Sequence, residues 1–497
     1  MKKRFTKRTK LIWSVVIGLV LIYLVMLIPP RAPAPLPAGE ASPFVWNQDD
    51  YWTYLESRFL NARSLDSASL ADSISIGLAR ADALLDSVGR IDADPSSPAL
   101  SRIETIFFEL CPLMAAQTDR LPELINLRNK LRMIVKDQSG HWDMSSPEAR
   151  DRLYRLLFGT RMAVEEVIQQ APNAPSSALT MATDEPSATP AAEILGVTVH
   201  SGDILVSRGG APTSALIARG NDYPGNFSHV ALVHVDDVTG QVSIIEAHIE
   251  KGVAIASIDD YLRDTKLRIL VLRLRADLPR LVADPMLPHK AATLALKRAR
   301  REHIPYDFEM DFHDNTKLFC SEVASDPYRQ LGIQLWMGMS HISSPGLRSW
   351  LAAFGVKHFE TQEPSDLEYD PQLRVVAEWY DPDKLYKDRL DNAVIDVMLE
   401  GAETGRMLEY DWFRLPLARV AKAYSEVKNQ WGVIGPVPEG MDAVAALKNV
   451  RFSADHAAIK KRLVSLADDF EKTKGYRPPY WQLVKLARQA ESDYDSR

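Results

Sequence analysis

The sequence is poor in cysteine and has no excess of positive charge. Only Cys111 and Cys320 occur in 497 residues, so no disulfide framework can form. Without a Cys-x-x-Cys pair, zinc ribbons and zinc fingers are excluded. The chain has 59 basic and 66 acidic residues, a formal net charge of −7. This balance provides no general attraction to nucleic acid, and we expect no nucleic-acid partner.

One long hydrophobic run stands near the start of the chain. Leu11 to Pro29 has 19 residues without a charge, which as a helix would cross a hydrocarbon core of about 30 Å. Residues 1–10 contain six basic residues and no acidic one, so this tail should stay in the cytoplasm. A cleaved signal peptide is the alternative, but its hydrophobic core is usually shorter. We therefore expect a single-pass anchor in a bacterial inner membrane, with the lipid bilayer as the partner of residues 11–29 and most of the chain on the periplasmic side.

The rest of the chain divides by composition and periodicity. Residues 30–47 are rich in proline and alanine and predict an extended spacer, whereas residues 173–195 have the Pro, Ser, Thr and Ala content of a linker. Between them, residues 48–172 predict a helical region. Residues 196–385 should form an α+β domain, and residues 386–497 a second helical region. Apolar residues at three- and four-residue spacing predict helices near 50–62, 66–90, 98–117, 121–136 and 146–170.

Neither helical region assembles a set of catalytic residues. Cys111 lies in an apolar run of the first region and is interpreted as core packing. These regions would suit docking to a protein partner or to the central domain.

Short β-type runs mark the central domain. The predicted strands include Gly202–Arg208, Ser228–Val235, Gln241–His248, Val253–Ala256 and Lys266–Arg275, the last with one polar face. We expect a helix to start at Ser257, because Asp260 follows three residues later, as in a capping box.

A predicted hairpin brings three ionisable residues together. Residues 236–240 form its loop, and if Asp236 pairs with Gln241, His229 faces His248 across the two strands. Residues two apart share a face, so His229, Glu246 and His248 lie on the same side. Glu246 is then a diagonal neighbour of His229, within reach of a hydrogen bond. His234 points to the opposite face.

Cys320 stands where the apolar approach Leu318-Phe319 turns into a predicted helix. The positive end of a helix dipole lowers the pKa of a thiol placed there. With a nearby histidine, it forms a nucleophile pair. We take Cys320 as the candidate nucleophile and His229 as the candidate base, with either Glu246 or His248 orienting the imidazole. Pro327 follows seven residues after Cys320 and predicts a short or bent helix.

A metal site is the competing interpretation of these residues. His229, His248 and Cys320 include metal-ligand types, but their spacing alone does not select metal binding. The acidic stretch 307–314 lacks the register and the central glycine of an EF-hand. We expect neither a metal nor a cofactor.

Four features of residues 196–330 resemble the permuted papain-like cysteine hydrolases of the NlpC type, the YiiX-like group. They are Gly202-Asp203-Ile204-Leu205; Ser228-His229-Val230-Ala231-Leu232-Val233; Ile245-Glu246-Ala247 followed by Gly252-Val253; and Tyr306-Asp307 with Phe319-Cys320-Ser321-Glu322-Val323. The resemblance implies a helix with the nucleophile packed on an antiparallel sheet. Retinol-acyltransferase-like relatives place their cysteine in an Asn-Cys-Glu-His setting instead.

The resemblance also implies roles for individual residues. Cys320 would be the nucleophile, His229 the general base and Glu246 the orienting acid. The turn Gly202-Asp203 would lie at the edge of the cleft, and Tyr306-Asp307 would be a structural or substrate-facing element. Ser228 and His248 are further candidates for the cleft lining.

These features together predict an exported, membrane-anchored thiol hydrolase that cleaves an amide through an acyl-enzyme. The substrate would be a peptidoglycan peptide or an acyl amide. A lipid ester or acyl hydrolase, or an acyltransferase, is an alternative on the same fold. A non-catalytic lipid-binding or scaffold protein of the cell envelope is a third expectation, because long helical regions flank the domain.

Overall fold

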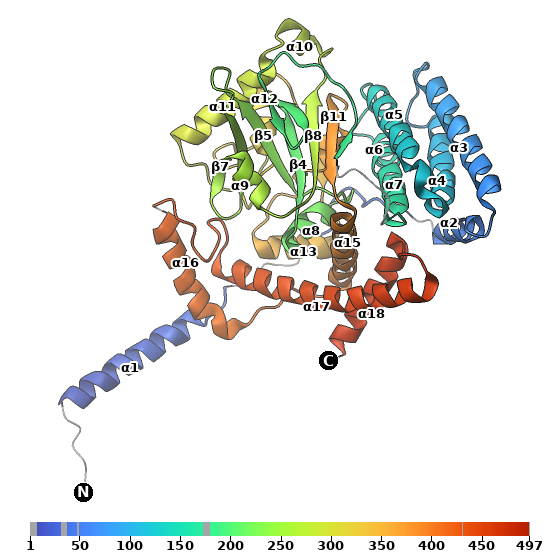
Figure 1. The fold of residues 1–497 in the computed structure, drawn as a ribbon. Helices are drawn as coiled ribbons and strands as arrows, with labels where there is room; N and C mark the ends of the chain where they lie inside the picture. Colours follow the sequence, from blue (N-terminus) through green and yellow to red (C-terminus); the bar gives the residue numbers. More distant parts are fainter. Residues whose placement is uncertain (1–6, 31–36, 47–48, 172–178, 430, 497) are drawn as a thin grey trace.

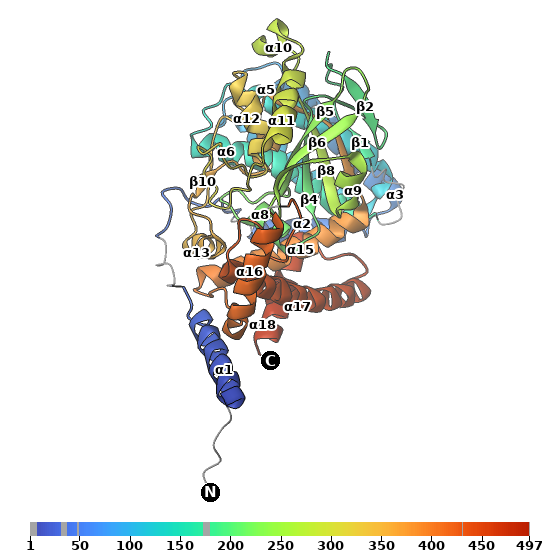
Figure 2. The ribbon, with the colours of Figure 1, turned by 90° about the vertical axis from the view of Figure 1, so that its left-hand side faces the viewer.

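A seven-stranded antiparallel sheet, in the order β1-β11-β8-β4-β5-β6-β7, forms the centre of the molecule. The computed structural model describes residues 7–30, 37–46, 49–171, 179–429 and 431–496. Helices of the N-terminal region pack beside the sheet, and the last two helices lie across one of its ends (Figures 1 and 2). The predicted α+β class with helical regions on both sides is confirmed.

The strands of the large sheet pair in an antiparallel arrangement throughout. They are β1 (Leu179–Met181), β4 (Ile204–Gly209), β5 (His229–Val235), β6 (Val242–His248), β7 (Gly252–Ala256), β8 (Lys266–Leu274) and β11 (Leu373–Tyr380). Two small sheets contain the pairs β2 (Ala191–Ile194) with β3 (Val197–His200) and β9 (Ser340–His341) with β10 (Glu360–Thr361).

Six helices of the first helical region occupy the five places where the periodicity predicts helices, with two of them in the segment 146–170. They are α2 (Asp49–Ala62), α3 (Ser67–Val88), α4 (Pro98–Ala116), α5 (Leu121–Ser139), α6 (Pro147–Tyr154) and α7 (Thr160–Gln169). A 3₁₀ turn, η1 (Thr118–Arg120), precedes α5, and a π-helical turn, η2 (Arg155–Gly159), joins α6 to α7. Cys111 is buried in the core of this region, as its apolar neighbours predict.

The remaining helices surround the sheet and follow it. Those of the central domain are α8 (Pro212–Arg219), α9 (Ile258–Arg263), α10 (Pro279–Ala283), α11 (Leu287–Arg301), α12 (Glu322–Gln330), α13 (Pro345–Phe354) and α14 (Asp366–Tyr369). The C-terminal ones are α15 (Pro382–Glu403), η3 (Trp412–Arg414), α16 (Leu415–Asn429), α17 (Ala443–Lys474) and α18 (Tyr480–Asp495). The predicted cap of α9 is present, since the Ser257 side chain accepts a hydrogen bond from the Asp260 N–H.

The predicted transmembrane helix is wrong. Among the described residues, no helix combines the length and the apolar character needed to cross a membrane. The helix in this place, α1 (Lys7–Met26), includes basic residues in its first turn and ends before Pro29. The helix projects from the body beside α16, where the Arg419 guanidinium donates to the carbonyl oxygen of Met26 (2.9 Å).

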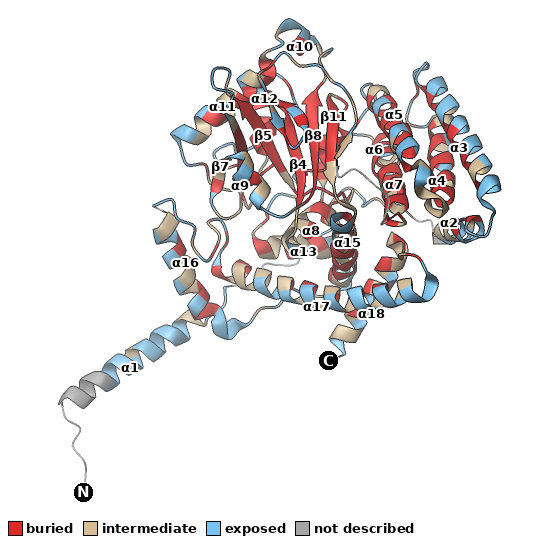
Figure 3. Cartoon of the chain, viewed as in Figure 1, coloured by how far each residue is buried: buried red, intermediate tan, exposed pale blue. Residues whose placement is uncertain are grey.

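Both faces of the sheet are buried, as Figure 3 shows along its strands. Ile204, Val206, Val230 and Leu232 belong to a core shared with α11 and α12. Their neighbours Leu205, Ala231 and Val233 belong to a second core on the opposite face. The alternation along β4 and β5 therefore serves two apolar layers, which is why these strands are almost continuously hydrophobic.

The predicted linker at 173–195 lies partly outside the described residues. Its described part contains β1 and β2. The strand β1 pairs with β11, with Thr180 opposite Glu378. A strand added at the edge of a sheet is held by backbone hydrogen bonds. The polar composition of this stretch does not indicate such bonds, so the sequence predicted a linker here and not a strand.

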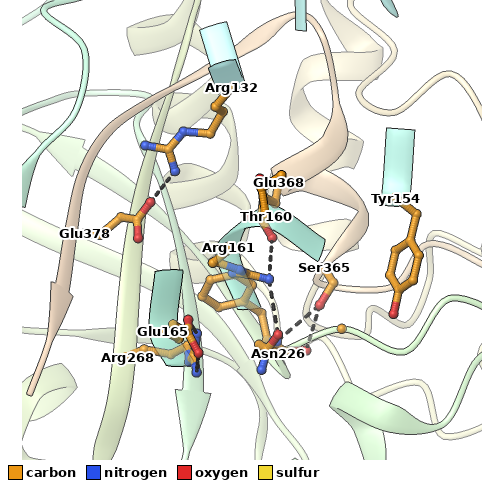
Figure 4. Close-up of polar contacts among 12 residues, drawn as sticks. Arg132, Tyr154, Thr160, Arg161, Glu165, Asn226, Arg268, Ser365, Glu368 and Glu378 are labelled. Atoms are coloured by element: carbon orange, nitrogen blue, oxygen red, sulfur yellow. Dashed lines mark hydrogen bonds and ion pairs between the residues drawn. The ribbon is translucent and has the colours of Figure 1, made fainter. Parts of the chain in front are cut away.

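Buried ion pairs connect the sheet to the helical regions on both sides. Arg268 of β8 contacts Glu165 of α7 (2.6 Å) and Asp388 of α15 (2.6 Å), and Arg208 of β4 contacts the same Asp388 (3.1 Å). Figure 4 shows Arg268 against Glu165. It also shows a second ion pair of this kind, between Arg132 of α5 and Glu378 of β11. The polar face predicted for the strand at 266–275 is thus a real feature, but it is buried under helices.

Candidate active site

The hairpin β5–β6 has the predicted register. Ala231 lies opposite Glu246, and Val235 lies opposite Val242. Its loop closes where the Asp236 N–H donates to the carbonyl oxygen of Gln241 (2.9 Å). Gly240, with φ +69°, supplies a left-handed position that this turn requires. The register places His229, Glu246 and His248 on one face, as the alternation predicts.

A single carboxylate connects the two histidines of this face. Nε2 of His229 lies 2.7 Å from one oxygen of Glu246, and Nε2 of His248 lies 3.0 Å from the other. The Glu246 side chain is only 2% exposed, whereas those of His229 and His248 are 18% and 19% exposed. Because Glu246 occupies Nε2 of His229, the Nδ1 atom of this ring remains for another partner.

The electrostatics of this group favour an ionised carboxylate beside a neutral imidazole. Burial alone would raise the pKa of Glu246, but hydrogen bonds from His229 and His248 outweigh it and hold the pKa well below its usual range. For His229, burial lowers the pKa, although Glu246 acts in the opposite direction. His229 is therefore neutral near pH 7 and able to accept a proton.

Cys320 lies against the first residues of β5. Its Sγ is 3.9 Å from the carbonyl oxygen of Ser228, the residue before His229. The side chain is buried, at 5% exposure. The helix α12 starts two residues later, at Glu322, and is only nine residues long with Pro327 inside it. The short helix that Pro327 predicts is present.

The expected lowering of the pKa of Cys320 is wrong. Burial raises it to about 12, the carboxyl group of Glu363 adds to the effect, and hydrogen bonds from the Val230 backbone and from Ser321 only partly offset it. The dipole of a short helix is a modest effect, whereas removing a thiolate from water is a large one. Cys320 is a neutral thiol in this structure.

Two neighbours of the site, Glu363 and Lys266, had no signal in the sequence, whereas a third, Tyr306, was expected from the resemblance. Glu363, in the loop before α14, is buried, and burial raises its pKa well above the usual range. The hydroxyl pKa of Tyr306 is raised likewise, by burial first and then by the nearby Cys320. Lys266 of β8 interacts electrostatically with Glu246 and His229, and its Nζ lies 4.4 Å from the ring centroid of Tyr261. Glu363 and Lys266 are brought to the site by tertiary folding, so no local motif could reveal them.

The turn Gly202-Asp203 is not part of the site. Ile204 pairs with Leu232, and the Gly202 N–H donates to the carbonyl oxygen of Val233. This turn therefore lies about four residues, or roughly 13 Å, along β5 from His229. The Asp203 carboxylate pairs with Arg273 (2.8 Å), a structural contact.

The other predicted cleft residues are divided between the site and its support. Ser228 supplies the carbonyl oxygen near Cys320. Tyr306 forms a bridge with Leu318, two residues before Cys320. Asp307 is buried and accepts hydrogen bonds from the backbone N–H groups of the loop that follows it, Glu309 (3.0 Å) and Asp311 (2.6 Å).

The first helical region holds the chain just before His229. Arg161 of α7 donates to the side-chain oxygen of Asn226 (3.2 Å) and lies over the Phe227 ring, 5.0 Å from its centroid. The Phe227 N–H donates to Oγ of Ser365 (3.1 Å). Figure 4 shows Arg161 against the Asn226 side chain, with Ser365 nearby. The candidate base is thus positioned by helices outside its own sheet.

The residues of the site do not form a metal-ligand set. Across the part of the chain that the structure describes, no three His, Cys, Asp or Glu side chains are grouped so as to hold a metal ion. His229 and His248 both direct Nε2 at Glu246. These two nitrogen atoms therefore contact a carboxylate and do not point at a common position for a metal ion.

Comparison with known proteins gives one family and one solved structure. Residues 198–377 match the family described as permuted papain-like amidase enzyme, YaeF/YiiX, C92 family. The crystal structure of metalloprotein yiiX from Escherichia coli O157:H7 matches with 17% identity and a TM-score of 0.30, over 36% of this chain and 98% of that chain. No curated protein matches the sequence. The resemblance to the YiiX-like group drawn from the sequence motifs is thus confirmed, over residues 198–377 of the chain.

Proposed function

We propose that this chain is a cysteine hydrolase of amide bonds, with Cys320 as nucleophile, His229 as general base and Glu246 as the group that orients the imidazole. The 2.7 Å contact between His229 Nε2 and Glu246 carries the proposal. It fixes the proton on Nε2 and leaves Nδ1 as the acceptor, on the residue next to the carbonyl that Cys320 Sγ approaches. The amidase family matched by residues 198–377 supports the reaction class.

The proposed reaction proceeds in two halves. Nδ1 of His229 takes the thiol proton, and Sγ of Cys320 attacks the amide carbonyl carbon to give a tetrahedral intermediate. The C–N bond then breaks, the amine leaves with the proton from His229, and a thioester remains on Cys320. In the second half, His229 removes a proton from water, which attacks the thioester carbonyl. The carboxylic acid leaves, and the proton returns to the thiolate.

The resting state is a neutral thiol beside a neutral imidazole. Burial raises the pKa of Cys320 and lowers that of His229, so both shifts oppose a thiolate–imidazolium pair. Proton transfer therefore accompanies substrate binding rather than preceding it. Glu246, ionised and almost fully buried, stabilises the imidazolium as it forms.

The proposed substrates are a cell-wall peptide and an acyl amide. Both have the amide carbonyl that a thiolate attacks, and they differ in what lies next to it: a charged or polar peptide, or an apolar acyl chain. A panel of peptide amides and N-acyl amides of matched length separates the two classes by kcat/KM. A lipid ester or acyl transfer would appear in the same panel, as turnover of esters or as transfer to an added amine.

The first test compares amide hydrolysis and acyl-enzyme formation in three variants of the full chain. Cys320→Ala should abolish both, and His229→Ala should lower the rate of acylation about a thousandfold or more. His234→Ala is the matched control, because His234 lies on the opposite face of the same strand, with its ring 5.3 Å from that of His289. Hydrolysis that survives in Cys320→Ala, with the fold intact by circular dichroism, would refute the proposal.

A further inference from the structure

A cavity of about 240 Å³ lies between the first helical region and the C-terminal helices, and none of its lining residues belongs to the proposed catalytic set. One wall comes from α2, α4, η2 and α7, and the opposite wall from α18 and the loop before it. An engineered apolar cavity of about 150 Å³ is large enough to bind benzene. This space therefore accommodates a ring or a short alkyl chain.

Aromatic side chains dominate the lining. They include Trp46, Trp52, Phe108, Phe158 and Trp481. The rings of Trp52 and Trp481 are nearly parallel, at 9°, with centroids 5.5 Å apart, so α2 and α18 face each other across stacked indoles. Trp46 meets Trp52 at an angle of 61°. The wall thus offers several π-faces, which attract both apolar groups and cations.

Two of the three carboxylates in the lining are already paired with arginine. Glu166 binds Arg389, and Asp396 binds Arg219 through two contacts of 2.8 and 2.9 Å. These ion pairs satisfy their own charges and present none to a ligand.

The third carboxylate, Glu56, is different. It accepts hydrogen bonds from the Tyr476 hydroxyl (2.8 Å) and from Nε1 of Trp481 (3.5 Å). Within the described residues it takes part in no ion pair. A half-buried carboxylate held between aromatic rings without a cationic partner favours a ligand that brings a positive charge.

We propose that this cavity binds an apolar ligand that carries an ammonium group. The alkyl or aromatic part fills the space between α4 and η2, and the cation lies at Glu56 against the rings of Trp52 and Trp481. An anionic ligand of the same length is disfavoured, because Glu56 would repel it and Arg219, the guanidinium in the lining, is already paired with Asp396. This binding site is separate from Cys320 and does not depend on the proposed hydrolysis.

The test uses three probes with the same chain length: octyltrimethylammonium, octanol and octanoate. Binding to the full chain is measured by calorimetry and by tryptophan fluorescence, since three tryptophans line the cavity. The ammonium probe should bind saturably with one site, at least tenfold more tightly than octanoate. Glu56→Gln should weaken the ammonium probe about tenfold and leave the binding of octanol within twofold.

Two further variants locate the binding. Ala115 lines the cavity, whereas its neighbour Ala116 is similarly half-buried but does not. Ala115→Phe should weaken both the ammonium probe and octanol more than tenfold, and Ala116→Phe should leave both unchanged. His229→Ala should bind all probes as the wild type does, which separates this site from the hydrolase.

Three results would overturn the proposal. Octanoate binding as tightly as octyltrimethylammonium would remove the charge preference. An unchanged ammonium affinity in Glu56→Gln would remove the role of this carboxylate, and this half of the test stands even where Ala115→Phe fails to fold. Equal effects of the two alanine variants would place the probes elsewhere.

Discussion

The pH dependence of Cys320 alkylation tests the neutral resting pair directly. With a thiol pKa of about 12, only about one molecule in ten thousand is a thiolate at pH 8. A free cysteine with a pKa near 8.5 is about a quarter ionised at that pH. Ionisation alone thus slows alkylation roughly two-thousandfold, and the burial of Sγ slows it further. Because the pKa is raised, the thiol stays protonated through neutral pH and gains reactivity only as the pH rises.

The assay measures iodoacetamide labelling from pH 6 to pH 10, with peptide mass spectrometry to separate Cys320 from Cys111. The logarithm of the Cys320 rate should rise with a slope of one across this range, without a plateau. The protein unfolded in urea is the control, and its rate should level off above pH 9. A plateau below pH 7 in the folded protein, lost in His229→Ala, would show a preformed thiolate–imidazolium pair and refute this account.

Four further substitutions have expected outcomes. Glu246→Gln should lower the rate of acylation about a thousandfold, because its amide N–H₂, turned toward His229, imposes the wrong imidazole tautomer; stopped-flow acylation measures it, and a loss below tenfold would contradict the role. Arg268→Met should lower the free energy of unfolding by about 3–5 kcal/mol, since buried Glu165 loses its partner and buried Asp388 keeps only Arg208; a change under about 1 kcal/mol in urea denaturation would contradict it. Gly202→Ala should destabilise by more than about 2 kcal/mol, because φ is +101° and the new Cβ would meet Pro288 at 2.3 Å. Gly240→Ala, with φ +69° and open space around it, should cost about 1 kcal/mol, and equal losses in the two glycine variants would refute the steric argument.

Local patterns predicted the parts of the fold that depend on near neighbours. The helices of residues 49–171 follow from apolar spacing along one face. The register of β5 and β6 follows from a short loop, and with it the contact of His229 with Glu246. To predict these features, it is enough to know the spacing of apolar residues in helices, the residues of the turn and the alternation of side chains along strands, all of which are visible in the sequence.

The wrong or missing predictions depend on distant parts of the chain. The pKa of Cys320 is governed by how deeply the helix packs on the sheet, which no local motif records. Arg268 of β8 was interpreted as part of a polar face. Its partners lie 103 and 120 residues away in the sequence, so a local pattern could not show that it is buried in ion pairs. The transmembrane prediction depended on the hydropathy of residues 11–29 alone. Hydropathy does not determine where a helix begins and ends, and α1 spans Lys7–Met26.

The ion pairs of Arg268 have a consequence for the order in which the sheet is stabilised during synthesis. Glu165 is made before the sheet, Arg268 with it, and Asp388 only after the last strand of the sheet. Until α15 emerges, Arg208 and Arg268 stand as neighbouring like charges without Asp388, and that end of the sheet is poorly stabilised. Cys320 and His229, the proposed nucleophile and base, are translated well before this point. A nascent chain therefore contains both residues before the ion pairs at that end of the sheet are complete.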